Sequence, residues 1–367
     1  MVLGSTEMGG AQMFILNLLN NIDLNHFQFD LAVNFEEQKN GLGDEFKQKG
    51  CNIYYLPYFK VYNYLSYVNK WRKFLSTHHY DIVHAHSTNS AAIYLKIAKE
   101  MGCRTIAHSH SAGFRGNLPS RLMKAYFSKR LGNVADYWYA CSAKAAANLY
   151  GKDFASFENF HFIPNAINVE KYLFDPCIAD ETRKKLGIHK DVFLCGHVGS
   201  FSAPKNHIFL IEIFMEILKM RPNSKLICCG AGPLLPEIQE KVSLLGIDDK
   251  VIFTGVVKKC ENYLMAMDVF IFPSLFEGFP ISIVEAEATG LPIMMSDVIT
   301  KEVDITDCIH RKELCEPAYE WAKSICDLTC NGCRSLYNSK VVNSQYNMHR
   351  SVNKLQNLYE QLYSEQS

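Results

Sequence analysis

The sequence predicts an α/β protein made of two Rossmann-like halves, each with helices on both faces of a parallel sheet. Apolar strand-like runs alternate with helical apolar patterns along most of the chain, as parallel sheets require. This alternation begins anew near residue 193, after a Pro-Asn turn. The chain has 367 residues, of which 48% are hydrophobic and 21% charged, and that suffices for two cores of ordinary domain size.

The chain opens with a short strand, a glycine loop and a helix. The apolar residues 1–4 precede Gly9 and Gly10, and a helical pattern follows from Phe14. The two glycines would let the backbone approach a phosphate or a sugar closely. The opening strand is short, so Met1 is either an internal methionine of a longer natural protein or a misassigned start, and both explanations stay open.

Four histidines follow two of the predicted strands in the first half. Residues 81–86 and 104–108 read as strands, and His110 comes just past the second one, where open α/β sheets bind their ligands. We expect His110 to be functional. We expect His84, His86 and His108 to be packed structural histidines or to bond the backbone at strand ends.

The second half repeats the pattern, and the first domain should end near Glu170. Residues 162–168 read as a strand and turn that leave the first domain. We therefore predict domains at residues 1–170 and 171–345. The predicted strands of the second half are residues 193–198, 225–229, 251–254 and 269–272.

The stretch that organises the chain is residues 269–292. It reads as a buried strand, a Pro-Ser turn, an acidic glycine loop and a helix that begins at about Ile281. Glu277 in the loop and Glu285 in the helix supply two fixed acceptors, which suit a polyol. The backbone amides from Gly278 to Ser282 open the helix, and their partial positive charge should attract an anion such as a diphosphate.

Glu277 and Glu285 form a Glu-x(7)-Glu pair within P-S-x-x-E-G-F-P-x-x-x-x-E-A-x-A-x-G-x-P. This pattern resembles the signature of the retaining, nucleotide-sugar-dependent glycosyltransferases of family four, among them bacterial capsular and exopolysaccharide enzymes. The resemblance covers nearly the whole chain. It implies the GT-B fold, in which two Rossmann-like domains face each other across a cleft and a last helix, here residues 346–367, crosses back to the first domain.

The resemblance also implies an activity: a sugar moves from a UDP-sugar to a glycan or lipid-linked glycan, with retention of configuration, in surface polysaccharide biosynthesis. By the same resemblance, Glu277 would hold the sugar hydroxyls, Glu285 the ribose, His110 the transferred sugar and Lys205 the phosphates. Around Glu277, Gly278, Phe279 and Pro280 would complete the donor loop.

The family usually places an Arg and a Lys in the loop after the second domain's first strand. Lys205 matches the Lys, whereas Ser200 stands at the Arg position, so one charge-assisted clamp is missing. Gly230 and Gly232 fit a tight turn under a diphosphate. With no Asp-x-Asp motif in the chain, we expect a metal-independent enzyme with no cofactor, the nucleotide sugar being a substrate.

Charge and cysteines limit the partners. The 38 basic and 38 acidic side chains give zero net charge, which argues against a nucleic-acid binder. Residues 1–170 hold 17 basic and 13 acidic side chains, a net +4. The 13 scattered cysteines suit reduced thiols. Zinc at Cys326, Cys330 and Cys333 with Cys308 or Cys315 is a weaker alternative.

Two basic stretches are candidates for the acceptor side. Residues 58–75 mix aromatics with basic residues, and residues 111–145 hold six basic residues against Asp136 alone. Either stretch could lie on an anionic membrane. In the first stretch, an ordinary helix with Val61, Leu65, Val68 and Leu75 in the core is the stronger interpretation, so the second stretch is the better acceptor candidate. No apolar run reaches membrane-spanning length, so we expect a cytosolic protein, at most attached to the membrane's inner face.

Two other functions compete with the transferase. A sugar-nucleotide epimerase can share the fold, although the Glu-x(7)-Glu context argues against it. A non-catalytic partner subunit is the second alternative, and Ser200 and the short first strand favour it.

Overall fold

The computed structural model describes residues 1–7, 9–34, 41–86, 90–110, 130–131, 134–328 and 334–365. It divides the chain into two compact units, Met1–Ala166 with Met348–Ser367, and Ile167–Asn347. The division falls at Ala166, four residues before the predicted boundary at Glu170. The predicted boundary of the last segment, residue 346, lies two residues from the observed return to the first unit at Met348.

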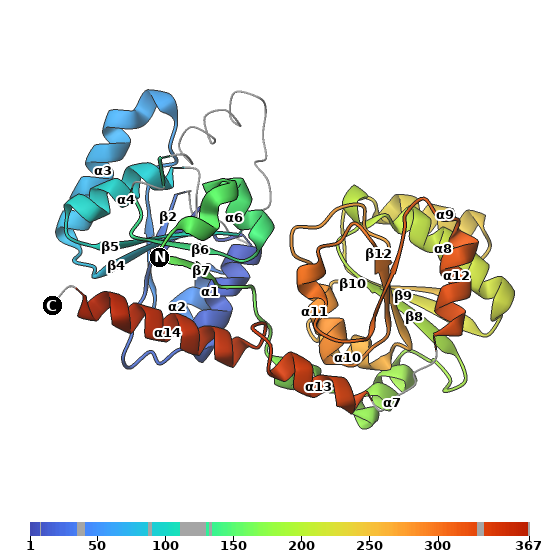
Figure 1. The fold of residues 1–367 in the computed structure, drawn as a ribbon. Coiled ribbons are helices and arrows are strands. Elements are labelled where there is room, and N and C mark those ends of the chain that lie inside the picture. Colours follow the sequence, from blue (N-terminus) through green and yellow to red (C-terminus); the bar gives the residue numbers. More distant parts are fainter. Residues whose placement is uncertain are drawn as a thin grey trace. The chain divides into compact units, whose positions relative to one another are not determined.

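The first unit contains a parallel sheet of seven strands in the order β3-β2-β1-β4-β5-β6-β7 (Figure 1). The strands are β1 (Val2–Leu3), β2 (Asp30–Val33), β3 (Asn52–Tyr55), β4 (Ile82–Ala85), β5 (Arg104–Ser109), β6 (Tyr137–Ala140) and β7 (Phe160–Phe162). The strand order reverses between β1 and β4, and ligands of such sheets bind outside the carboxyl ends of the strands at this point.

Helices cover both faces of this sheet, as the alternating pattern predicted. One core contains residues of α1 (Gly10–Asn21), α2 (Gly43–Gln48) and α14 (Met348–Ser364). The other contains residues of α3 (Tyr64–Thr77), α4 (Ala91–Glu100) and α6 (Ala143–Tyr150). The chain's last helix is thus part of the first unit's core, through Val352, Leu355 and Leu362.

The second unit contains a parallel sheet of six strands in the order β10-β9-β8-β11-β12-β13. The strands are β8 (Phe193–Val198), β9 (Ser224–Cys229), β10 (Val251–Gly255), β11 (Val269–Phe272), β12 (Ile293–Ser296) and β13 (Ile309–Lys312). All four residues of β11 are buried, because a parallel sheet covered on both faces needs continuous apolar strands. The strand order reverses between β8 and β11.

The helices of the second unit again pack on both faces. They are α7 (Pro176–Lys185), α8 (His207–Met220), α9 (Leu235–Leu244), α10 (Cys260–Ala266), α11 (Ile281–Ala288), α12 (Ala318–Asp327) and α13 (Ser335–Val342). Residues of α8, α9 and α12 form one core, and residues of α10 and α11 belong to the other.

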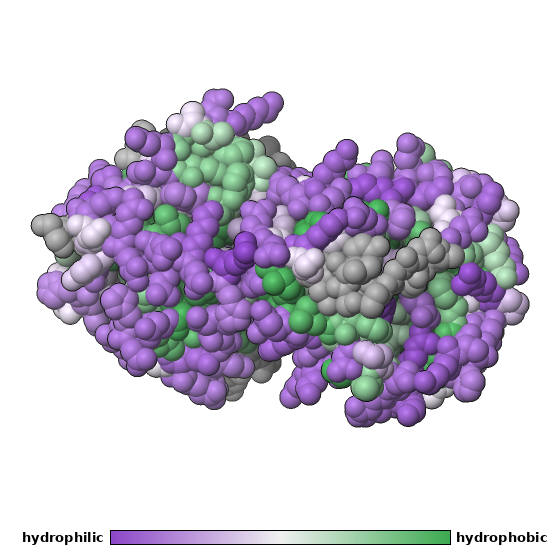
Figure 2. Space-filling model, turned by 60° about the horizontal axis from the view of Figure 1, so that its bottom comes forward, coloured by the Kyte–Doolittle hydropathy of each residue, from purple (hydrophilic) through white to green (hydrophobic). Residues whose placement is uncertain are grey.

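One predicted core was wrong in half of its residues. In α3 the buried stripe consists of Tyr67, Trp71 and Leu75, spaced four residues apart. Leu75 and the partly buried Val68 pack in the core as expected. Val61 and Leu65 were also expected there, but they are 68% and 76% exposed. The aromatic stripe bears the larger apolar area, and its burial therefore turns Leu65 outward. On the face drawn in Figure 2, hydrophilic residues cover most of the described surface and apolar residues form separate patches. No helix in the described ranges is long and apolar enough to cross a membrane.

Candidate functional site

Lys205 and Glu277 form an ion pair at the carboxyl edge of the second sheet. The Lys205 Nζ donates to Glu277 Oε1 at 2.6 Å, and the two side chains are only 16% and 13% exposed. Lys205 follows β8 and Glu277 follows β11, so the pair lies at the point where the strand order reverses. A partly dehydrated cation and carboxylate at this edge can bind a phosphate and a hydroxyl respectively.

Backbone contacts between two loops hold this pair. The Leu275 amide donates to the Pro204 carbonyl at 2.8 Å, and the Asn206 side chain donates to the Pro273 carbonyl at 3.2 Å. Asn206 has a φ of 56°, in the left-handed region that Asn tolerates better than most residues. The Lys205 Nζ also lies 4.8 Å from the centre of the Phe272 ring, a cation–π contact that helps to hold it in place.

Gly230 and Gly232 shape the loop after β9 by close backbone contact. A Cβ at Gly230 would lie 2.0 Å from the Gly199 carbonyl oxygen, and one at Gly232 would lie 2.5 Å from that of Phe201. Gly230 also has a φ of 145°. Both glycines let this loop press against the loop that carries Lys205, and this packing role is independent of any bound diphosphate.

Glu285 and Glu287 lie on α11 and have different partners. Glu285 Oε1 accepts a hydrogen bond from the Tyr172 hydroxyl at 2.7 Å. Burial raises the pKa of Glu285, and the bond from Tyr172 opposes that rise. Burial raises the pKa of Glu287 to about 8, although Thr306 and the Ile305 amide donate to its Oε1. The carboxyl of Glu285 is therefore held by the Tyr172 side chain. The carboxyl of Glu287 instead holds the turn at residues 305–306.

The start of α11 leaves its amides without a side-chain cap. Pro280 is the N-cap residue, and no acidic residue lies in the first turn. Such an end carries partial positive charge and accepts an anion readily. Phe279 stacks on Tyr346 with ring centres 5.0 Å apart, which fixes the Gly278–Pro280 segment beside Glu277.

Ser200 is exposed, and the hydrogen bonds that the structure describes for its side chain and carbonyl are to Ser202, two residues away. Its Oγ lies 3.0 Å from the Ser202 Oγ, and its carbonyl accepts from the Ser202 amide at 2.8 Å. The position that carries Arg in the resembling family is thus occupied by a small side chain in a tight turn.

Four histidines gather at the carboxyl edge of the first sheet. His84 and His86 lie two residues apart along β4 and its end, and His108 and His110 likewise along β5, so all four project from one face. The His86 Nδ1 lies 2.8 Å from His110 Nε2, and the His84 Nε2 lies 3.2 Å from His108 Nδ1. Burial lowers the pKa of His110 to about 4, so its imidazole is neutral at neutral pH and can donate or accept.

His84, His86 and His108 are packed, as expected, but their bonds are to other side chains. His84 Nδ1 bonds the Tyr359 hydroxyl at 2.7 Å. The alternating H-x-H spacing on two neighbouring strands was the signal that could have predicted a shared cluster. No comparable signal pointed to Tyr172 as the partner of Glu285, because the two residues are 113 positions apart.

Gly9 and Gly10 begin α1. Gly9 is the N-cap residue without a side-chain cap, and the first turn holds no acidic residue. A Cβ at Gly10 would find its nearest neighbour, the Asn165 amide nitrogen, 3.9 Å away. Gly10 therefore leaves open space at an uncapped helix start, which fits a ligand's approach, whereas a Cβ at Gly9 would lie 2.9 Å from Gln12 Oε1.

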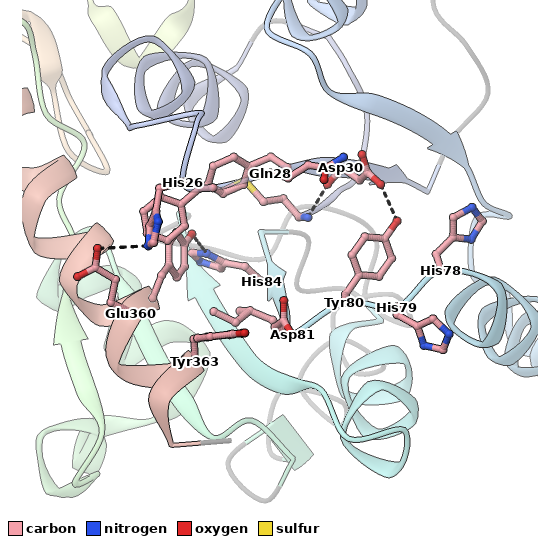
Figure 3. A pocket seen from close by; sticks show the side chains of 15 residues that line it. His26, Gln28, Asp30, His78, His79, Tyr80, Asp81, His84, Glu360 and Tyr363 are labelled. Atoms are coloured by element: carbon pink, nitrogen blue, oxygen red, sulfur yellow. Dashed lines mark hydrogen bonds and ion pairs between the residues drawn. The ribbon is translucent and has the colours of Figure 1, made fainter. Parts of the chain in front are cut away.

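A large cavity lies at the other edge of the first sheet. It encloses about 830 Å³ and is lined by His26, Asp30, Tyr80, Asp81, His84 and Tyr363, with further residues drawn in Figure 3. Asp30 and Ile82 begin β2 and β4, so the cavity opens at their amino ends. Ligands of doubly wound sheets bind at the carboxyl ends, and the cavity is therefore a poor candidate for the nucleotide site.

Several sequence candidates lie outside the described residues. These are Cys330 and Cys333 of the cysteine cluster, and residues 111–129, 132 and 133 of the second basic stretch. Cys326 is partly buried on α12, and Cys308 and Cys315 are free thiols.

Two family models match the chain. The model described as Glycosyltransferase Family 4 matches residues 8–171, and the model described as Glycosyl transferases group 1 matches residues 192–331. EpsF of Bacillus subtilis, named as a glycosyltransferase, is 29% identical over 365 residues, which are 98% of this chain and 95% of EpsF.

A second relative and a solved structure extend this result. An Escherichia coli protein named UDP-Gal:alpha-D-GlcNAc-diphosphoundecaprenol alpha-1,3-galactosyltransferase is 28% identical over 240 residues, 62% of this chain and 60% of its own length. The crystal structure of Anabaena HepE in complex with UDP superposes with a TM-score of 0.79 and 15% identity, covering 98% of each chain. The fold is thus of the GT-B type, as predicted.

Proposed function

We propose that this chain, which belongs to glycosyltransferase family four, transfers a sugar from a UDP-sugar to a glycan or lipid-linked glycan with retention of configuration. The observation that carries the proposal is the Lys205–Glu277 pair at the strand-order reversal of the second sheet. It supplies one cation for a diphosphate and one carboxylate for sugar hydroxyls. EpsF and the undecaprenol-linked galactosyltransferase support a role in surface polysaccharide biosynthesis.

In the proposed reaction the bond between the anomeric carbon and the diphosphate oxygen breaks, and the acceptor hydroxyl oxygen forms the new bond on the same face. The departing phosphate oxygen takes the acceptor's proton. Lys205 exchanges Glu277 for the diphosphate and neutralises the growing charge, together with the open amides at the start of α11. With these groups present, we propose that transfer needs neither a metal ion nor a cofactor.

The other site residues position the donor. Glu277, released by Lys205, binds the sugar hydroxyls, and Glu285 binds the ribose while Tyr172 orients its carboxyl. We propose for His110 a hydrogen bond to the transferred sugar, with His86 fixing its tautomer through the bond at 2.8 Å.

The acceptor side includes a membrane contact. Around the start of α3, five apolar or aromatic side chains are 46–83% exposed: Tyr58, Val61, Tyr62, Tyr64 and Leu65. Lys60 lies among them, over the Tyr62 ring. Aromatic and aliphatic side chains beside a cation suit the interface of an anionic membrane. We propose that the protein works at the cytosolic face of such a membrane, where a lipid-linked acceptor is available.

A labelled-donor assay tests the proposal. The full chain is incubated with UDP-glucose, UDP-galactose or their N-acetyl counterparts, with and without undecaprenyl-diphosphate-linked GlcNAc in vesicles. We expect label in the lipid fraction with one donor, and an anomeric configuration unchanged from donor to product by NMR. Inversion of configuration would contradict the proposed mechanism.

The same assay separates the two alternative functions. Conversion of one UDP-sugar into another without any acceptor would identify an epimerase. UDP binding without transfer to any acceptor in a folded protein would favour a non-catalytic partner subunit, which Ser200 at the Arg position motivates.

A further inference from the structure

Three buried histidines of the first unit have the arrangement of a metal site. His84 and His86 from the end of β4 and His108 from β5 are 2%, 6% and 0% exposed. One ring nitrogen of each lies within 4.8 Å of the others. Clusters of neutral imidazoles in a closed interior are the common ligand set of zinc and other late transition metals.

One pair within the cluster has the spacing that one ion needs. His84 Nε2 and His108 Nδ1 are 3.2 Å apart. Two nitrogens bound to one tetrahedral zinc ion at its usual bond length are about 3.3 Å apart. An ion could therefore take the place of the single proton that these two nitrogens share, with little movement of either ring.

Two of the three remaining nitrogens already have the second contact that a bound histidine needs, and His108 Nε2 has none among the described residues. His84 Nδ1 contacts the Tyr359 hydroxyl at 2.7 Å, and His86 Nδ1 contacts His110 at 2.8 Å. Metal-bound histidines nearly always have such a partner on the other nitrogen, because it fixes the ring's tautomer and orientation.

Several polar atoms at the cluster are unsatisfied, among them His108 Nε2. His86 Nε2 is buried and has no hydrogen-bond partner among the described residues, and the same holds for the Tyr139 hydroxyl. The Tyr139 ring lies 5.5 Å from the His84 ring and 5.8 Å from the His108 ring, centre to centre. A buried polar atom without a partner is costly, and an ion beside His86 Nε2 would remove that cost.

One member of the cluster borders a cavity. His84 lines the cavity at the amino edge of the first sheet, together with Tyr359 (Figure 3).

We propose that the first unit binds one zinc-class ion through His84, His86 and His108, with Tyr139 or a water molecule at the fourth position. The ion would join the ends of β4 and β5 next to His110 and stabilise that edge. It is separate from the diphosphate chemistry assigned to Lys205, which belongs to the second unit.

Metal analysis of the full chain tests the proposal, with a tag that contains no histidine. After dialysis against zinc we expect about one ion per chain in the parent and in His161→Gln, and far less in His86→Gln. His161 is the matched control, because it is a partly buried histidine of the same sheet outside the cluster. Circular dichroism checks that each variant is folded.

Cobalt titration and thermal melting need no variant. Cobalt in the metal-free parent should give the visible ligand-field bands of a tetrahedral site without the ultraviolet sulfur charge-transfer band that a cysteine site would show. Zinc should raise the melting temperature by several degrees. Absence of bound metal in the parent, an unchanged melting temperature, a sulfur band, or equal zinc in His86→Gln would each overturn the proposal.

Discussion

The two sheets place different chemistry at equivalent points. Each sheet reverses its strand order once, between β1 and β4 or between β8 and β11. At that edge the first unit has four stacked, neutral histidines, and the second has the ion pair of Lys205 and Glu277. Topology therefore determines where a ligand can bind, whereas the side chains decide which ligand. Neutral imidazoles suit hydroxyl groups, and an exchangeable ion pair suits a charged diphosphate.

The largest expected effect concerns Glu277. Glu277→Ala should lower transfer by at least about a hundredfold, because a carboxylate that orients the sugar is lost. Steady-state assays with labelled donor measure this change, and Glu212→Ala on the exposed surface of α8 is the control. Circular dichroism should show an intact fold. Retention of most activity would refute the role of Glu277. The ion pair of the second sheet would then not be the donor site that we contrast with the histidines of the first sheet.

Lys205 is the second test of the charged site. Lys205→Ala should lower kcat by about a hundredfold, because the leaving diphosphate loses a preorganised cation. Lys219→Ala, which breaks an exposed pair with Glu216, should be silent. Because Lys205→Ala also leaves Glu277 unpaired, the double variant should cost less than the sum of the two single ones. Strict dependence of the parent on added magnesium would mean that a metal, and not Lys205, neutralises the phosphate.

Glu287 should make the second unit sensitive to alkaline pH. Its folded pKa is about 8, above the value of 4.5 in the unfolded chain. The folded state therefore holds the proton more tightly, and the stability that Glu287 contributes is present below pH 4.5 and is lost as pH rises through 8. Glu287→Gln should remove this loss, so its melting temperature at pH 9 should exceed the parent's by several degrees.

The matched measurement compares the melting temperatures of the parent and Glu287→Gln at pH 5. The Glu287 carboxyl of the folded parent is protonated at that pH, so the two melting temperatures should differ little. A parent whose melting temperature does not fall relative to Glu287→Gln between pH 5 and pH 9 would contradict the raised pKa.

The smallest expected effect concerns Ser200. If no other cation fills the Arg position, Ser200→Arg should tighten UDP binding by about 1–2 kcal/mol, and the gain should shrink at high salt. Calorimetric titration with UDP measures the change, and Ser202→Arg in the same turn is the control. No gain would imply another cation, with Arg115 and Arg121 outside the described residues as candidates. Weaker binding would show that the turn requires serine.

Local patterns predicted the strands well and the contacts poorly. β8 and β11 have the predicted bounds, because each is a continuous apolar run between turn residues. The contact between Lys205 and Glu277 spans 72 positions and depends on the adjacency of β8 and β11, which no local pattern specifies. The family resemblance supplied both residues without supplying their bond.

The exposed start of α3 shows a second limit of prediction from the sequence: it does not tell which face of a helix is buried. The sequence offers two possible apolar stripes in that helix, and their spacing alone does not rank them. Packing against α4 decides, because Trp71 stacks on Tyr94 with ring centres 4.7 Å apart. Leu65 then faces outward, and the surface that we assign to the membrane follows from a tertiary contact.

The position of α14 also affects the order in which the protein can fold during synthesis. The chain enters the second unit at Ile167 and leaves it at Asn347, and these two residues form a β-bridge, so the unit closes on itself. The first unit's core lacks Val352, Leu355 and Leu362 until the last segment leaves the ribosome. Domains that emerge complete generally fold first. Here the later half of the chain should reach its native state before the earlier half, whose α1 face stays uncovered in the interval.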